Sequence, residues 1–277
     1  YGLVGSEMCI RDSSSTTRFS EVFESRNLIA ELIRRDFNVR YKQTGLGILW
    51  AIINPGVNIL LYLFVFGLLV RLPTPEYNAP YAAVLISAIL FWNLFSTSML
   101  TASDALINNM HLVTKVYFPR LSLCIASVFV ALIDFLIAFI VFVPLALLYH
   151  VDISLIRLLL LIPCIIITLM LGCGFGCAMA ILKLKYRDIR HILPLITQVI
   201  FFASPIVYTL SIVPEQYKIF YSFNPITGIV MMSRWAILGG APIDLTMLTY
   251  SLISAFVVMC LGVIYFVKND RSVADYE

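Results

Sequence analysis

The chain has 277 residues, of which 61% are hydrophobic and 13% are charged. Soluble domains carry about 25% charged residues, so this composition excludes a soluble enzyme, a disordered tail and a disulfide-stapled secreted domain. The formal net charge of +3 is carried by segments between apolar runs, and nothing in its distribution indicates binding to nucleic acid.

Bilayer-length apolar runs recur along the sequence. A helix needs about 20 apolar residues to cross the hydrocarbon core, whereas a β-barrel shows short alternating segments. The pattern predicts an all-α polytopic membrane protein with one transmembrane domain over residues 43–277. We expect six transmembrane helices, at about 46–70, 80–102, 121–148, 157–182, 191–212 and 245–267.

The basic residues are distributed unevenly between the two sides of this topology. Of the 19 Lys and Arg, 15 fall before the first span, in the second and fourth loops or in the tail, and 4 fall in the other loops. Because cytoplasmic loops carry the excess of Lys and Arg, we expect both termini in the cytoplasm.

Two segments precede the first predicted span. Residues 1–18 have mixed polarity and no basic stretch followed by an apolar core, so they do not form a signal peptide; we interpret them as a non-native or disordered leader. Residues 19–42 place Ile29, Ile33 and Phe37 on one helical face. Arg34 lies on the opposite face, which predicts an amphipathic interface helix on the membrane surface. A soluble helix packed on another protein is the alternative.

The second cytoplasmic loop contains a short amphipathic pattern. Ser103 and Asp104 can cap a helix over residues 105–115. Leu106, Met110 and Val113 follow the i, i+4, i+7 spacing of a groove-binding face. A soluble partner could push on such a helix, and an ordinary loop with one helical turn is the alternative.

Asp134 lies near the middle of the third predicted span. An acidic residue at membrane depth is a functional candidate, for example a proton relay. No Lys, Arg or His faces it from another predicted span, so a hydrogen bond to a neighbouring Ser or Thr is the simpler interpretation.

Small residues interrupt the fourth predicted span. Gly172 and Gly176 have the GxxxG spacing that allows helices to approach closely. Cys173 and Cys177 would share a helix face there, and metal binding by these thiols is the alternative. The three histidines are scattered along the sequence, so we expect no metal site.

Residues 216–243 contain an apolar stretch too short to cross a bilayer. The uncharged run 219–233 has a length typical of re-entrant or interfacial segments. Asn224-Pro225 interrupts it. We therefore expect two short helices that form an external cap on the bundle.

Motifs of enzymatic chemistry are absent from the sequence. There is no GxxxxGK[ST] phosphate loop, no HExxH and no GxSxG. We expect no catalytic residues in this chain, which leaves a pore, a transporter or a transport subunit.

Five stretches together resemble the ABC-2 type permeases that export polysaccharides. They are Arg40–Trp50 followed by Asn54-Pro55, Lys115–Arg120, Tyr186–Ile189, Phe201–Tyr208 and Asn224-Pro225. Their order and spacing hold from about residue 19 to residue 277. The nearest subgroups are the O-antigen and teichoic-acid permeases.

The resemblance implies a homodimer with two ATP-binding subunits on the cytoplasmic face. Those subunits would hold ATP and Mg, and this chain would carry no cofactor. It also implies an undecaprenyl-linked, O-antigen-like polysaccharide as substrate and the bacterial inner membrane as location. Export of teichoic acid, of capsular polysaccharide or of drugs is the alternative, as is a secondary transporter, which would need intramembrane charges or matched broken helices.

The resemblance further implies which residues act. Coupling to the ATPase is expected at Leu106, Asn109, Met110, His111, Val113, Lys115, Arg187 and Asp188, and the interface helix is expected to use Ile29, Ile33, Arg34 and Phe37. The expected channel and gate aromatics are Tyr62, Phe66, Trp92, Phe95, Phe202, Tyr208, Tyr221 and Phe223. Residues 216–240 become a pair of gate helices with their break at Asn224 and Pro225.

Overall fold

A computed structural model describes residues 19–42, 44–77, 79–113, 115, 118–147, 155–240 and 245–270 of the chain. The predicted leader 1–18 lies outside these residues. All regular elements in the described part of the chain are helices, with no strand, which confirms the predicted all-α class.

Twelve α-helices follow one another along the described residues. In chain order they are α1 (Phe19–Glu24), α2 (Arg26–Lys42), α3 (Trp50–Tyr62), α4 (Tyr81–Asn108), α5 (Met110–Val113), α6 (Leu121–Leu147), α7 (Leu155–Leu159), α8 (Leu161–Lys185), α9 (Ile189–Ala203), α10 (Glu215–Phe223), α11 (Pro225–Leu238) and α12 (Leu245–Asn269). A 3₁₀ turn, η1 (Gly47–Leu49), precedes α3, a π-helical segment, η2 (Leu63–Leu69), follows it, and a second 3₁₀ turn, η3 (Leu210–Ile212), precedes α10.

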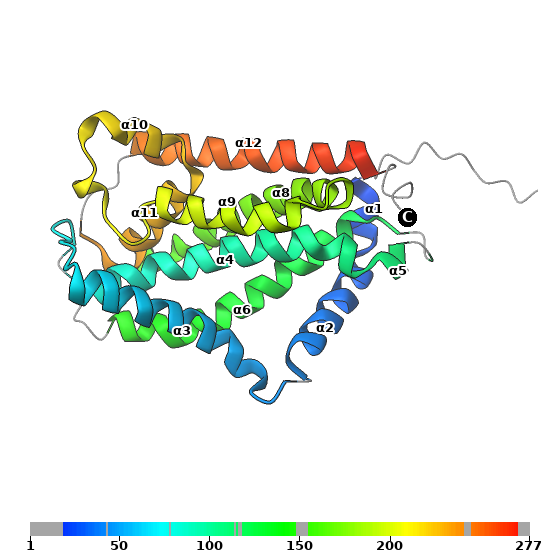
Figure 1. Ribbon diagram of the computed structural model, residues 1–277, viewed down its shortest axis with the longest axis horizontal. Helices are drawn as coiled ribbons and strands as arrows, with labels where there is room; N and C mark the ends of the chain where they lie inside the picture. The colour runs from blue at the N-terminus through cyan, green and yellow to red at the C-terminus, as the bar shows by residue number, and fades with distance from the viewer. Residues whose placement is uncertain are drawn as a thin grey trace, which may run out of the picture.

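Figure 1 shows the long helices running side by side along the bundle. The elements α1 and α5 and the C-terminal end of α12 lie at one end, which we call the α5 end. The opposite end, which we call the α10 end, carries α10.

Five helices of the described chain are long and apolar enough to cross a membrane, by length and composition. The predicted span over 191–212 is different, because its helix, α9, ends after 15 residues at Ala203. Ser204 precedes Pro205 and has the extended conformation (φ −107°, ψ 150°) that a following proline favours. Beyond the break the chain continues to α10 at the α10 end of the bundle (Figure 1). The fifth predicted span is therefore a short helix followed by an irregular segment.

The centre of the bundle is α4, which is buried along most of its length between α6 and α8. A Cβ atom on Gly172 would lie 2.7 Å from Ser98 Cβ, and one on Gly176 would lie 2.6 Å from Ala102 Cβ. These distances are too short for a real side chain. The predicted GxxxG contact is thus the face by which α8 packs against α4.

Candidate coupling and gate sites

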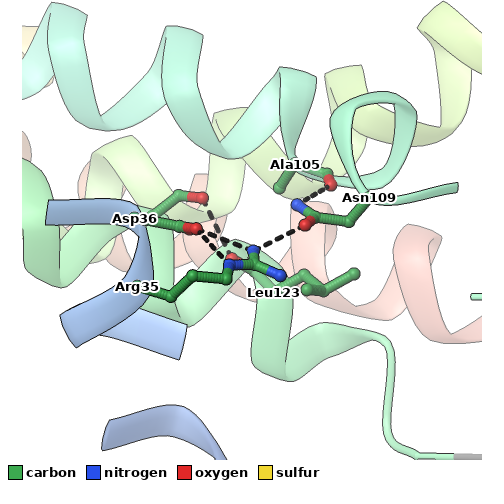
Figure 2. Close-up of polar contacts among 6 residues, drawn as sticks. Arg35, Asp36, Ala105, Asn109 and Leu123 are labelled. Atoms are coloured by element: carbon green, nitrogen blue, oxygen red, sulfur yellow. Dashed lines mark hydrogen bonds and ion pairs between the residues drawn. The ribbon is translucent and has the colours of Figure 1, made fainter. Parts of the chain in front are cut away.

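The α5 end of α4 is fastened to the N-terminal helix α2. Asn109 ends α4 with a non-helical backbone (φ −118°, ψ 22°), and its Nδ2 donates to the Ala105 carbonyl at 2.9 Å. Its Oδ1 accepts a 2.6 Å hydrogen bond from Nη2 of Arg35, which also pairs with Asp36 at 2.7 Å (Figure 2). The interface helix therefore holds the point at which α4 breaks.

A second tie joins the same end of α4 to α8. Lys183 Nζ lies 2.7 Å from Asp104 Oδ1, and the Lys183 side chain is only 4% exposed. A buried ammonium group is costly unless it is paired. The last turn of α4 is thus held from two sides, by α2 and by α8.

The predicted coupling helix over 105–115 differs from the structure in its start and in its orientation. The continuous helix α4 extends to Asn108, and the separate helix is the four-residue α5. The sequence pattern puts Leu106 and Val113 on the partner-facing side, but they are 0% and 9% exposed and pack in the core with Asn109 close by. Because α4 ends at Asn108 and α5 begins at Met110, Leu106 and Val113 do not share one face of a single helix as the spacing predicts.

The surface left at the α5 end is polar. His111 and Lys115 are exposed, and Met110 is half-buried against the core. Arg187 and Asp188 are exposed in the turn between α8 and α9. These five residues remain candidates for contact with a partner, whereas Leu106, Asn109 and Val113 have an internal role.

Helix α2 packs against the bundle along one face. Ile29 and Ile33 contact the core and Arg34 is exposed, in agreement with the predicted faces. The rings of Phe37 and Tyr41 pack at a tilt with their centroids 5.0 Å apart, and Tyr41 Oη reaches Asp134 at the midpoint of α6.

At that midpoint α2 supplies the partners of Asp134. The carboxylate pairs with Arg40 and accepts a 2.5 Å hydrogen bond from Tyr41 Oη. The expected Ser or Thr partner is therefore wrong, because the partners come from a helix that the sequence pattern puts outside the spans. Burial, together with this bond, raises the pKa of the Tyr41 phenol, so the phenol stays protonated and donates. The one signal in the sequence is that Arg40 interrupts the apolar stripe of α2.

Most of the predicted channel aromatics form a packed cluster, which we call the aromatic cluster. Its rings come from α3, α4 and α9, with Tyr62 stacked at 5.0 Å on Phe201 and Trp92 edge-on to Phe201 at 5.3 Å. Phe66, Phe95 and Phe202 join its margins. Phe201 is at its centre, and sequence reasoning misses it.

Burial divides the cluster into two groups. Trp92, Phe95 and Phe201 are 7%, 1% and 4% exposed, so in this chain they are core residues. Phe202 is 50% exposed and Tyr62 is half-buried, which leaves these two accessible to a substrate.

The two breaks near the α10 end lie against each other. Asn224 caps α11 by accepting a 3.0 Å hydrogen bond from the Ile226 amide, with Pro225 at the first helical position. Its Nδ2 donates to Ser204 Oγ at 2.9 Å. The predicted break at Asn224-Pro225 is therefore joined to the unpredicted break after α9.

Arg234 fixes the irregular segment that follows α9. This residue of α11 is 2% exposed. Its guanidinium donates to the carbonyls of Ile206 (2.7 Å), Tyr208 (3.1 Å) and Val84 (3.3 Å). Irregular backbone at membrane depth must find internal partners, and Arg234 supplies them. From the sequence, the position of Arg234 beside an apolar run indicates a loop residue. Its burial becomes evident only from the tertiary structure.

Two tyrosines link the fixed segment to α10. Tyr208 Oη lies 2.8 Å from Tyr221 Oη, with the rings 6.4 Å apart. Both line a cavity of about 610 Å³. Phe223, the remaining predicted gate aromatic, instead packs at 5.7 Å on Tyr250 of α12 and is 61% exposed.

These features define a helical membrane bundle in which α4 is held by α2 and α8 at the α5 end and two helix breaks meet near the α10 end. Comparison with known families places the chain within one of them: residues 27–238 match the ABC-2 type transporter model, and the chain belongs to that family.

Curated relatives extend the match along most of the chain. An O-antigen export system permease protein, RfbA, of Klebsiella pneumoniae is 26% identical over 87% of this chain and 92% of its own length. The RfbA of Myxococcus xanthus is 27% identical over 76% and 80%. The polysialic acid transport protein KpsM of Escherichia coli is 24% identical over 90% and 96%.

Proposed function

We propose that this chain is the permease subunit of an ATP-driven exporter that moves lipid-linked, O-antigen-like polysaccharide across the bacterial inner membrane. The observation that carries the proposal is the match to the O-antigen export permease over 92% of that protein's length. The aromatic cluster supports it, because sugar rings present apolar CH faces that pack on aromatic side chains.

Energy comes, in this proposal, from two separate ATP-binding subunits that hold ATP and Mg. The sequence has no phosphate loop of its own. The subunits dock at the α5 end, on the surface formed by Met110, His111, Lys115, Arg187 and Asp188. The excess of Lys and Arg in the loops at that end supports a cytoplasmic location for it and for both termini.

The proposal includes a homodimer with the export path between the two copies. Two exposed apolar faces support it: Leu60 on α3 is 67% exposed and Val199 on α9 is 68% exposed. They flank the aromatic cluster, so pairing of copies along these faces brings Tyr62 and Phe202 of both chains toward a shared path. The hairpin of α10 and α11 closes that path on the outer side.

Capsular polysaccharide is the second candidate substrate. KpsM, whose name refers to polysialic acid transport, is matched over 96% of its length. For the O-antigen-like polymer we infer an undecaprenyl anchor, and both candidate substrates would use the architecture described above.

The test is deletion of the gene in its source bacterium, followed by immunoblotting for surface and intracellular polymer. We expect surface polymer to disappear and undecaprenyl-linked polymer to accumulate in the cytoplasm. Complementation by the unmodified gene should restore export. His111→Glu with Lys115→Glu should not, because it reverses charge at the docking surface, whereas Lys218→Glu at the α10 end should. Unchanged surface polymer in the deletion strain would refute the proposal.

A further inference from the structure

A second cavity opens within a single subunit, away from the aromatic cluster. It has a volume of about 610 Å³ and lies between α2, α3, α4 and α6. Its walls include Leu90–Thr97 of α4 and Ala131–Ala138 of α6, which are the midpoints of these helices. Ligand sites in proteins typically occupy about 300–1,000 Å³, so this cavity has room for a small ligand.

Carboxamide side chains line this cavity on two facing helices. Asn54 and Asn58 lie one helical turn apart on α3, and Asn93 and Thr97 lie on α4. Within the described residues, no hydrogen bond joins any of these four side chains to a protein group. Asn54 and Asn58 are exposed, and Asn93 and Thr97 are half-buried. The polar ends of these four side chains are therefore available to a polar occupant of the cavity.

The charges of the cavity are already matched. Arg40 pairs with Asp134, and Tyr41 Oη donates to the same carboxylate. No uncommitted charge is left among the lining residues to select a phosphate or a carboxylate. The free groups are amides, which both donate and accept, a hydroxyl, and the Trp50 indole, which is 42% exposed.

We propose that this cavity binds a neutral glycosyl unit of the exported polymer, at a site separate from the aromatic cluster. Hydroxyl groups of a sugar ring meet the amides of Asn58 and Asn93, and an apolar ring face packs on Trp50. This inference rests on the proposed function. It adds a polar holding site beside the path, where the polymer is oriented before it passes the aromatics.

Photo-crosslinking in cells tests the proposal on the complete exporter. Asn58 is replaced by the photo-reactive amino acid p-benzoylphenylalanine, and Phe256 is replaced in the same way as a control. Phe256 is on α12, is 57% exposed and does not line the cavity. After irradiation, the purified permease is probed with an antibody against the host polymer and analysed by mass spectrometry. A polymer adduct at position 58 and none at position 256 is the expected result.

Other products overturn the inference in distinguishable ways. An adduct at position 58 with only a phospholipid shows a lipid head-group site, and an adduct with only a second permease copy shows a dimer contact. If position 58 gives no polymer adduct while surface polymer still depends on the permease, the inference fails and the proposed function stands. Surface polymer that does not depend on the permease refutes both.

The initial rate of polymer export provides a second test of the inference. Asn58→Leu and Asn93→Leu should each slow initial export about five-fold at limiting polymer, as expected for the loss of one neutral hydrogen bond. Asn58→Gln should recover part of the rate. Thr249→Leu, an exposed site on α12 that bonds only within its own helix, is the matched control and should leave the rate unchanged. Wild-type rates in both leucine variants overturn the inference.

Discussion

Removal of the Arg234 guanidinium should loosen the irregular segment that follows α9 without unfolding the bundle. Arg234→Met keeps a long apolar stem but withdraws the donors from three carbonyls. The Val84 carbonyl still accepts from Ser87 Oγ at 2.9 Å. The carbonyls of Ile206 and Tyr208 have no other hydrogen bond among the described residues, so these two are left unsatisfied.

The size of the effect follows from these two acceptors. Each buried unsatisfied group costs about 1–3 kcal/mol, which gives about 2–6 kcal/mol for the pair. The variant no longer buries an arginine charge, and this offsets part of the cost. A net loss of about 2 kcal/mol lowers the Tm by roughly 4–8 °C in a chain of this size. The Tm of Arg234→Lys should lie between those of the unmodified protein and Arg234→Met, because the lysine ammonium is a point donor that cannot reach both carbonyls as the planar guanidinium does.

Two assays distinguish loosening of this segment from unfolding of the bundle. Thermal denaturation followed by size-exclusion chromatography gives the Tm, and hydrogen exchange of residues 204–209 reports local opening. Exchange there should accelerate while exchange in α4 stays slow. Lys218→Met, which breaks the exposed pair with Glu215, is the control and should shift the Tm little. A wild-type Tm and unchanged exchange in Arg234→Met would refute the role assigned to this arginine.

Two further sets of substitutions test the α4–α8 packing and the Arg40–Asp134 pair. Gly176→Leu should lower the yield of folded protein and its Tm, because overpacking of this kind costs about 1–3 kcal/mol or more. Gly45→Ala is the control and should be neutral, because a Cβ atom there has nothing within 4 Å. Equal stability of the two variants would contradict the close α4–α8 contact. Asp134→Ala and Arg40→Ala should each destabilise the protein, and the double variant should be less destabilised than their sum, by about 0.5–3 kcal/mol; strict additivity in thermal melts would show that the pair does not interact.

Local chemistry made much of the fold predictable from the sequence. The positions of the long helices follow from apolar length, and the break at Asn224-Pro225 follows from a good N-cap beside a residue that suits the first helical turn. The close contact through Gly172 and Gly176 follows from the absence of side chains.

The missed features depend on tertiary contacts. Arg40 and Asp134 are 94 positions apart, and their pairing requires α2 to lean along α6, which no periodicity reveals. Arg234 has the appearance of an interfacial residue until its carbonyl partners are known. Leu106 is buried because it belongs to the central helix α4, and Val113 is buried beyond the break at Asn109, whereas spacing rules assume one continuous helix with both residues on its exposed face.

ATP-dependent movement of polymer in a purified system tests the central claim most directly. The permease is reconstituted into inverted proteoliposomes together with the ATP-binding subunit of the same bacterium, and labelled lipid-linked polymer is supplied from outside. The account predicts that polymer becomes protected from an added glycosidase only when permease, ATP-binding subunit and ATP with Mg are all present, and that His111→Glu with Lys115→Glu abolishes this protection. Protection without the permease, or none with the complete system although ATP is hydrolysed, would contradict it.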